Sequence, residues 1–334
     1  MKAIRLTELG GPEKLHIEEI ARPEPGPGEL LVRLERAAFN RRDVFITQNL
    51  YPGISLPRTL GSDGAGEVAA LGDGVLGPEL GTPVVIDPEL GWNDDPQAAQ
   101  RHGNILGMPR DGTFAQYVAV PASAVFRKPK PLSYDEAAAI PLAGLTAYRA
   151  AFTRGRLSKD DVVLIPGIGG GVQTFVLLYA VHAGARAFVT TGSDEKLERA
   201  LALGASGGVN YRSDPDWHKT IRKLSGGPTL VVDGTGGQTL ARSLEIARTG
   251  ARIVVYGATQ GDATIRPFAL FWRHLDLLGT SMGSPADFRA MLELFEVGGL
   301  RPVVDRVYPL EEAAAAAARV LAGEQFGKVV LRIS

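Results

Sequence analysis

Apolar and polar residues alternate over short segments in the first 125 residues of the chain. These segments are KAIRL (2–6), LHIEEI (15–20) and LLVRLERAAF (30–39). Stretches rich in glycine and proline separate them, and the stretch 23–27 predicts a rigid surface turn. Short alternating segments with regular turns are typical of strands, so this part of the chain is predicted to form a mostly β domain.

The pattern changes after residue 125, where short apolar runs alternate with segments of helical spacing. The apolar runs Val162 to Ile165 and Ala187 to Thr191 flank a helical segment from Thr174 to Ala183. Ser133, followed three residues later by Glu136, predicts the capped start of an earlier helix. Strands that alternate with helices predict an α/β domain with a doubly wound parallel sheet.

The two patterns divide the chain into two expected domains. Further strands are predicted at 230–233, 251–256 and 275–284, and helices at 214–224, 238–247, 289–301 and 313–318. The last segment, 327–333, predicts a strand that returns to the first domain. We therefore expect a mostly β domain from 1–125 and 288–334, and a dinucleotide-binding domain from 126–287.

A cluster of glycines joins the strand at 162–165 to the helix that follows it. The turn contains Gly167, Gly169, Gly170 and Gly171, followed by Val172. Such a turn lets the backbone approach a pyrophosphate, and the N-terminus of the next helix offers it N–H groups and a positive dipole end. The pattern predicts that these five residues bind a dinucleotide.

The third glycine of the expected G-x-x-G-x-x-G spacing is replaced by Gln173. In dinucleotide folds that glycine allows the helix to pack closely on the strand. Either the helix is displaced outward, which we favour, or the Gln173 side chain points into the groove.

The end of the second strand predicts which nicotinamide cofactor is used. An NAD site usually places an acid there for the ribose 2′-hydroxyl, whereas this strand ends in Thr191, Gly192 and Ser193. Lys196 follows, and Tyr211 and Arg212 come further on, all donors that suit a 2′-phosphate. The sequence favours NADPH over NADH, although a lone Lys196 is also compatible with a solvated helix residue.

Composition narrows the range of partners. The chain has 334 residues, 45% of them hydrophobic, a formal net charge of −1 and no cysteine, which excludes disulfides, thiolate metal ligands and thiol nucleophiles. No basic run points to nucleic acid or to a membrane surface. The N-terminal segment lacks the apolar core of a signal peptide, and no apolar stretch is long enough to span a bilayer. We expect a small-molecule substrate and a cytoplasmic location.

Several motifs together resemble a known family. They are Asn40-Arg41-Arg42-Asp43, Tyr51-Pro52, Gly61-Ser62-Asp63-Gly64-Ala65-Gly66-Glu67-Val68, Gly112-Thr113-Phe114-Ala115-Gln116-Tyr117-Val118, Ala143-Gly144-Leu145-Thr146-Ala147-Tyr148, the glycine turn and Phe326-Gly327-Lys328-Val329-Val330. Over essentially the whole chain the sequence resembles the zinc-free quinone oxidoreductase branch of the medium-chain dehydrogenase/reductase superfamily. The resemblance implies a Rossmann domain, a GroES-like catalytic domain, and hydride transfer from NADPH to a quinone or an activated C=C bond. It also implies a homodimer or homotetramer, because the strand expected at 275–284 commonly pairs across a dimer axis in this superfamily.

Zinc alcohol dehydrogenases of the same superfamily carry a Cys before the Asp and a Gly-His-Glu segment. In this sequence Asn40 takes the place of that Cys, and Ser62-Asp63 that of His-Glu. Asn and Ser are poor ligands of Zn²⁺, and the five histidines of the chain lie in no ligand spacing, so no catalytic metal is expected. The segment 87–110 has the length of the relatives' four-Cys structural lobe but none of its thiols. It predicts a surface loop, held by Trp92 and a turn at 93–96, with Asp94 and Asp95 solvated.

The resemblance also implies site residues. Asn40, Asp43 and Tyr51 are expected to orient the substrate, and Thr146 to lie beside the nicotinamide. Asp43 is also compatible with an anchor for a helix start, and Tyr51 with a core residue. The cofactor contacts expected outside the glycine turn are Thr146, Gly192, Ser193, Lys196, Tyr211, Gly257, Ala258 and Lys328.

Two other functions remain open from the sequence. One is the reduction of small aldehydes or ketones, which without a Lewis acid would need Tyr51 or another donor to polarise the carbonyl. The other is an NADPH-binding sensor without turnover.

Overall fold

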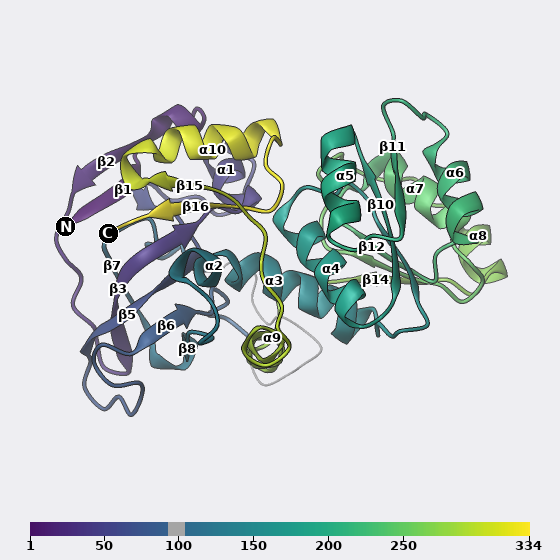
Figure 1. Cartoon of the computed structure of the whole chain (residues 1–334). Coiled ribbons are helices and arrows are strands. Elements are labelled where there is room, and N and C mark those ends of the chain that lie inside the picture. The colour runs from purple at the N-terminus through teal and green to yellow at the C-terminus, as the bar shows by residue number, and fades with distance from the viewer. Residues whose placement is uncertain (93–103) are drawn as a thin grey trace. The chain divides into compact units, whose positions relative to one another are not determined.

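The structure, a computed structural model, describes residues 1–92 and 104–334 (Figure 1). Within this range the chain forms two compact units, which we call unit 1 (Met1–Leu145 with Gly283–Ser334) and unit 2 (Thr146–Met282). These boundaries differ from the expected 126 and 287. Residues 126–145 join unit 1 because helix α2 (Tyr134–Ala139) packs on strands β3 (Glu29–Ala38) and β5 (Asp63–Leu71).

Unit 1 consists mainly of β-structure. Its larger sheet has the strand order β15-β16-β3-β5-β6-β8, with β7 also paired to β3, and its smaller sheet has the order β2-β1-β4. The remaining strands are β1 (Lys2–Leu6), β2 (Leu15–Glu19), β4 (Arg58–Thr59), β6 (Pro83–Ile86), β7 (Tyr117–Pro121), β8 (Val125–Arg127), β15 (Val304–Pro309) and β16 (Lys328–Arg332). The strands expected near the N-terminus are present, and β16 pairs with β3, so the C-terminal strand returns to this unit as expected.

The helices of unit 1 are α1 (Arg41–Thr47), α2, α9 (Pro285–Glu296) and α10 (Ala313–Ala322), with 3₁₀ turns at Pro12–Lys14, Ala122–Ala124 and Leu310–Glu312. Among these helices, α2 and α10 pack on strands of the larger sheet, and α1 packs on α10. Helix α10 contributes Ala313, Ala316 and Ala317 to a core built from the inward residues of β1, β3 and β16. The small side chains let the helix approach the sheet closely. Helix α3 (Pro141–Tyr148) contains the boundary between the units.

Unit 2 has a parallel sheet in the order β11-β10-β9-β12-β13-β14. Counted from β9, this is the order 3-2-1-4-5-6 of the Rossmann fold. The strands are β9 (Val162–Ile165), β10 (Arg186–Thr191), β11 (Gly207–Asn210), β12 (Leu230–Asp233), β13 (Arg252–Val255) and β14 (Asp276–Gly279). The prediction of a Rossmann sheet beside a mostly β, GroES-like domain is confirmed.

The helices of unit 2 connect these strands. They are α4 (Gly171–His182), α5 (Asp194–Ala202), α6 (Trp217–Ser225), α7 (Gly237–Ile246) and α8 (Pro267–Trp272), with a π-helix at Arg149–Arg154. Helix α4 begins three residues before the expected Thr174, because the turn residue Gly170 already serves as its N-cap. In the described part of the chain no helix combines the length and apolar character needed to cross a membrane.

Capping residues set two helix starts in unit 1. Ser133 accepts a hydrogen bond from the Glu136 N–H, as the sequence predicts for α2. Ser284 forms the same box with Asp287, so α9 runs from Pro285 to Glu296 rather than over 289–301. The turn expected at 93–96, with Asp94 and Asp95, lies outside the described residues, as does His102.

Candidate active site

Three polar residues of unit 1 meet at one end of its larger sheet. Asn40 follows β3, Asp63 opens β5 and Lys328 opens β16. Both β5 and β16 run antiparallel to β3, with Ala38 opposite Asp63 in one pair and opposite Val330 in the other. The end of β3 therefore lies beside the starts of its two neighbours, which brings the three side chains together.

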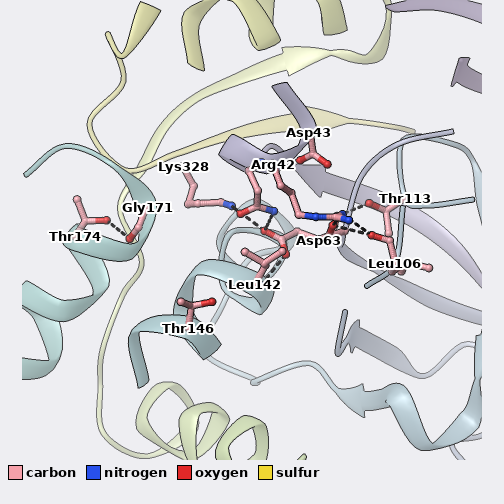
Figure 2. A network of polar contacts seen from close by, with 12 residues as sticks. Arg42, Asp43, Asp63, Leu106, Thr113, Leu142, Thr146, Gly171, Thr174 and Lys328 are labelled. Carbon is pink, nitrogen blue, oxygen red and sulfur yellow. Dashed lines mark hydrogen bonds and ion pairs between the residues drawn. The ribbon is translucent and has the colours of Figure 1, made fainter. Parts of the chain in front are cut away.

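The three side chains form a closed hydrogen-bonded network. Figure 2 shows Lys328 pointing toward Asp63. The Lys328 ammonium donates to Asn40 Oδ1 at 2.6 Å and to Asp63 Oδ2 at 2.8 Å, and Asn40 Nδ2 donates to the same Asp63 oxygen at 2.9 Å. The Leu142 N–H donates to Asp63 Oδ1 at 2.7 Å. Lys328 is 2% exposed and Asp63 0%, so this is a buried ion pair whose carboxylate is fully hydrogen bonded. Lys328 was expected among the cofactor contacts, which stays a prediction; within unit 1 its ammonium is bonded to Asn40 and Asp63.

A second buried cation lies beside this network. Arg42 Nη1 donates to Ser62 Oγ at 2.6 Å and to the Leu106 carbonyl at 2.9 Å. Its Nε donates to the Tyr51 hydroxyl at 3.3 Å, and the guanidinium lies 4.8 Å from the centre of the Tyr51 ring. Tyr51 is half-buried, so it acts both as packing against the core and as a partner of the guanidinium.

Asp43 anchors the start of helix α1. Its Oδ2 accepts the Asn40 N–H at 2.8 Å, which is the helix-anchoring role considered from the sequence. Burial raises the pKa of Asp43 to about 6, although Arg42 and the Asn40 N–H lower it. The other oxygen, Oδ1, is buried without a hydrogen-bond partner among the described residues.

Two more buried carboxyl groups follow strand β6. Asp87 Oδ1 accepts the Glu89 N–H, and Glu89 Oε1 accepts the Gly91 N–H. Burial raises the pKa of Asp87 to about 8. Burial also raises the pKa of Glu89, opposed by its Gly91 hydrogen bond and by the charge of Arg42. The charge of Arg42 therefore acts on the Glu89 carboxyl group, but within the described chain the two side chains form no ion pair.

The donor set of this region does not fit a zinc ion. Asn40 and Asp63, at two of the positions where zinc-bearing relatives carry ligands, already hold the Lys328 ammonium. Ser62, at the third, holds the Arg42 guanidinium. Over residues 1–92 and 104–334 no cluster of three His, Cys, Asp or Glu side chains is arranged to bind a metal. Two cations of the chain therefore take up the groups that would face a metal.

The glycine turn of unit 2 adopts the conformation that a phosphate cradle needs. Gly167 and Gly169 have φ values of 71° and 133°, which favour glycine. The Gly167 N–H donates to Thr190 Oγ1 at 3.2 Å, which ties the turn to β10. Gly170 is the N-cap of α4 and provides no capping side chain, so the first N–H groups of this helix are suited to an anion.

Gln173 bends back over this turn. Its Oε1 lies 2.4 Å from the position that a Cβ of Gly170 would take. The amide group therefore lies at the turn itself, the second of the two positions considered from the sequence. A side chain at position 170 would force this amide to move, whereas glycine leaves room for it.

Side chains around Gly192 build the other end of the candidate dinucleotide site. The Tyr211 hydroxyl and the Arg212 Nε each lie 2.9 Å from the Cβ position of Gly192. Ser193 is the N-cap of α5, and its Oγ accepts the Lys196 N–H at 3.3 Å. Hydroxyl and cationic groups from two loops therefore converge at the end of β10.

The remaining expected residues of unit 2 lie at strand ends and on α3. Gly257 follows β13, and its Cβ position is 3.1 Å from the Gly234 carbonyl, while Ala258 packs on Gly236. Thr146 is buried, and its hydroxyl contacts the Met282 sulfur at 3.9 Å. Gly257 and Ala258 lie at the carboxyl ends of parallel strands, where open α/β sheets hold their ligands.

The sequence did not assign a role to Arg42, nor bonds between Asn40, Asp63 and Lys328. The motif around Asn40 contains Arg42, but the residue type alone does not show that this arginine is buried. Its buried neighbours in α1, Asp43 and Val44, are the only local indication of its burial. Asp87 and Glu89 were taken as part of a surface loop, yet both are buried.

Comparison with known proteins identifies the family. Residues 26–130 match the family model for the alcohol dehydrogenase GroES-like domain, and residues 171–297 match that for zinc-binding dehydrogenases. The zinc-type alcohol dehydrogenase-like protein YogA of Leptosphaeria maculans is 37% identical over 343 residues, which cover 96% of this chain and 94% of that protein. Human quinone oxidoreductase is 27% identical over 342 residues, covering 99% and 97% of the two chains.

A solved structure adds to this. A crystal structure of an NAD-dependent alcohol dehydrogenase superposes with a TM-score of 0.92 and 39% identity, covering 100% of both chains. The chain therefore belongs to the medium-chain dehydrogenase/reductase superfamily of oxidoreductases.

Proposed function

We propose that the protein is an NADPH-dependent, zinc-independent reductase that transfers a hydride to a quinone or an activated C=C bond. The observation that carries this proposal is the bonding of Asn40, Asp63 and Ser62 to cations of the chain itself. When these groups do not hold a Lewis acid that would polarise an isolated carbonyl, an acceptor activated by its own conjugation is favoured. The likeness to human quinone oxidoreductase agrees with such an acceptor.

The choice of NADPH rests on the groups around Gly192. A 2′-phosphate carries up to two negative charges and accepts several hydrogen bonds, and Arg212, Tyr211 and Lys196 are donors suited to it. The glycine turn and the start of α4 would hold the pyrophosphate, with Gly167, Gly169, Gly170, Gly171 and Val172 at its surface. Gly257 and Ala258 would border the nicotinamide half, with Thr146 beside its ring.

The bound cofactor supplies the hydride, and the chain's own residues orient the acceptor. The Lys328–Asp63 pair fixes the amide of Asn40, since Lys328 holds its oxygen and Asp63 its nitrogen. Asp43 holds the backbone of the same residue. The rigid placement of Asn40, together with Tyr51 beside Arg42, would position a conjugated carbonyl compound and exclude water from it.

A panel of acceptors tests the reaction. With NADPH, we expect kcat/KM for quinones and enones to exceed that for small aldehydes by at least about tenfold, in protein treated with a chelator. Turnover of aldehydes alone, or activity lost on chelation from protein with stoichiometric zinc, would overturn the proposal. Tight NADPH binding without turnover on any acceptor would identify a sensor instead.

Cofactor choice is tested by reversing one charge. Lys196→Glu should weaken NADPH binding by about 1–3 kcal/mol while NADH binding changes little, because the new carboxylate repels the 2′-phosphate. Lys159→Glu, an exposed lysine elsewhere in unit 2, is the matched control. Calorimetric titration with both cofactors gives the result. Equal losses for NADPH and NADH, or tighter binding of NADH by the wild type, would contradict the assignment.

A further inference from the structure

Arg42 has a buried donor that nothing in the described chain uses. Its side chain is 8% exposed, and Nε and Nη1 are bonded to Tyr51, Ser62 and Leu106. Its other terminal nitrogen, Nη2, is buried and has no hydrogen-bond partner among the residues described. A guanidinium offers five N–H groups, so the two on Nη2 remain available for a ligand.

Arg42 also forms no ion pair within the described chain, although its charge acts on the nearby carboxyl groups of Asp43 and Glu89. No carboxylate of residues 1–92 or 104–334 lies within ion-pair distance of it, and its bonded partners are hydroxyl and carbonyl groups, which are neutral. A buried cation that is not directly bonded to a carboxylate is costly to the fold. By contrast, the adjacent cation, Lys328, is paired with Asp63. Arg42 is therefore held in place by neutral acceptors, and no carboxylate is bonded to its guanidinium.

The geometry points to Arg42 as a binding site for an oxyanion, and we propose that its Nη2 holds the carbonyl oxygen of the conjugated acceptor as that oxygen gains negative charge. This inference rests on the proposed function and names the group that recognises the substrate. The ligand class is a carbonyl compound conjugated to the reducible bond, or a phenolate, which has the charge and shape of the reduced form.

The chemistry balances without a metal. Hydride adds to the far carbon of the C=C bond, and the π electrons of that bond move so that the carbonyl oxygen becomes an enolate oxygen. Arg42 donates a hydrogen bond to this oxygen and keeps its proton, because a guanidinium does not deprotonate in proteins. Water then supplies the proton that completes the reduced product. A preorganised donor aimed at developing charge lowers the barrier more than it strengthens substrate binding.

Access to Nη2 depends on Tyr51. Its ring faces the guanidinium, and Tyr51 is only half-buried, next to the exposed residues Leu50 and Pro52. The Nε–Tyr51 bond of 3.3 Å is the longest of the Arg42 hydrogen bonds. Rotation of the Tyr51 side chain would uncover the guanidinium while the bonds to Ser62 and Leu106 hold it in position.

Binding of 4-nitrophenol, with no cofactor present, tests the site directly. The wild-type protein should bind the ionised form preferentially and raise the ionised fraction near neutral pH, which is visible in the absorption spectrum. Arg42→Gln should weaken binding of the phenolate by at least about tenfold and abolish the spectral change. Arg110→Gln, which removes an arginine that pairs with Glu29 in the same unit, is the matched control and should behave as the wild type.

Two results would overturn the assignment of Arg42 as an oxyanion site. Unchanged phenolate binding in folded Arg42→Gln overturns the inference, as does a wild type that binds only the neutral phenol. If Arg42→Gln does not fold, Arg42→Lys replaces it. Lysine keeps the charge but lacks the forked donors, so the same loss is expected, and its absence would again overturn the inference.

Turnover provides a second readout. For an enone with NADPH, Arg42→Lys should lower kcat by about a hundredfold with a smaller change in KM, because the bond to the oxygen strengthens as charge develops. The two tests separate the claims. If phenolate binding depends on Arg42 but no acceptor supports NADPH oxidation, the anion site is supported and the proposed function is contradicted. Full enone reduction by Arg42→Gln would support the proposed function and contradict the role of Arg42.

Discussion

Buried charges set the character of the unit 1 site at the scale of single residues. Lys328 and Asp63 are both almost fully buried, and each would be costly to the fold alone. Together they are stable because Asn40 and the Leu142 N–H add hydrogen bonds to the ammonium and to both carboxylate oxygens. The pair therefore acts as a rigid support for Asn40, and its integrity should control the stability of the whole unit.

Removing the cation tests this view. Lys328→Met leaves the Asp63 carboxylate buried without its counter-charge, and the free energy of unfolding should fall by about 3–5 kcal/mol. The double variant Lys328→Met, Asp63→Asn should recover part of that loss, since no charge is then left unpaired. Urea unfolding of the three proteins measures both effects. A double variant no more stable than Lys328→Met would show that the pair does not stabilise the fold through its charge.

Asp87 should make stability depend on pH. Burial raises the pKa of its carboxyl to about 8 in the folded protein, whereas an unfolded Asp ionises near pH 4. Below that pH both states are protonated and the full stability is present. Between about pH 4 and pH 8 the folded state holds a proton that the unfolded state has lost, so stability falls as pH rises.

Asp87→Asn removes this proton exchange and keeps the oxygen that accepts the Glu89 N–H. Relative to the wild type, the variant should be more stable at pH 9 than at pH 5 by at least about 1 kcal/mol. Asp43, whose pKa is also raised, titrates in both proteins and cancels in the difference. Urea midpoints at several pH values give the slope, with exposed Asp73→Asn as control. Parallel profiles for the wild type and Asp87→Asn would contradict the prediction.

The family resemblance implied that Asn40, Asp43 and Tyr51 lie near the substrate, but it could not say what each side chain contacts. Asn40 and Lys328 are separated by 288 positions, and their bond arises from strand pairing that no local pattern encodes. The residue types alone showed that the zinc ligands are missing. They could not show that Lys328 and Arg42 bind the residues at those positions.

At the scale of elements, the glycine turn and helix α4 were predicted most fully. The strand, the glycines and the helix lie in the order and place that the pattern indicated. Residue spacing could not settle where the Gln173 side chain goes, since that depends on its rotamer. In the structure its amide bends over Gly170, in the turn that is expected to receive the pyrophosphate.

Gln173→Ala should therefore favour the cofactor. Alanine keeps the helix propensity of α4 and removes the amide from the turn. NADPH should bind about three- to tenfold more tightly, equivalent to roughly 0.7–1.4 kcal/mol, with little change in the urea midpoint. Calorimetric titration and urea unfolding of the two proteins measure this. Weaker binding by Gln173→Ala would show that the amide assists the phosphates instead of obstructing them.

At the scale of the whole molecule, the change in hydrophobic periodicity predicted two units, but at residues that differ from the boundaries in the structure. The helix predicted near Ser133 was assigned to the dinucleotide-binding domain, which was expected to start at residue 126, yet α2 buries its alanines against β3 and β5 of unit 1. A helix between two domains carries the same apolar face whichever sheet it packs on. Only its partners, far away in the sequence, decide to which unit it belongs.

The last prediction concerns β14, one of the two edge strands of the unit 2 sheet, the other being β11. Strand β14 pairs with β13 on one side, and within the described chain no strand covers its other side. An uncovered edge presents unpaired N–H and C=O groups, which natural proteins usually protect. Leu277 on this strand is 39% exposed, and Phe268, Phe271 and Trp272 on the preceding helix α8 are exposed as well. We propose that a second copy of the chain covers β14 by pairing with the same strand across a twofold axis.

Leu277→Lys should weaken that dimer by at least about tenfold in Kd, because a charge would enter an apolar interface along the edge. Leu76→Lys, at a fully exposed position of unit 1, is the control and should leave the dimer intact. Sedimentation at a series of concentrations separates monomer from dimer. A monomeric wild type would remove the proposal. A dimer that survives Leu277→Lys but is lost in Trp272→Lys would move the interface from the strand edge to the aromatic face of α8, where self-association would bury the stacked rings of Phe268 and Trp272 without extending the sheet.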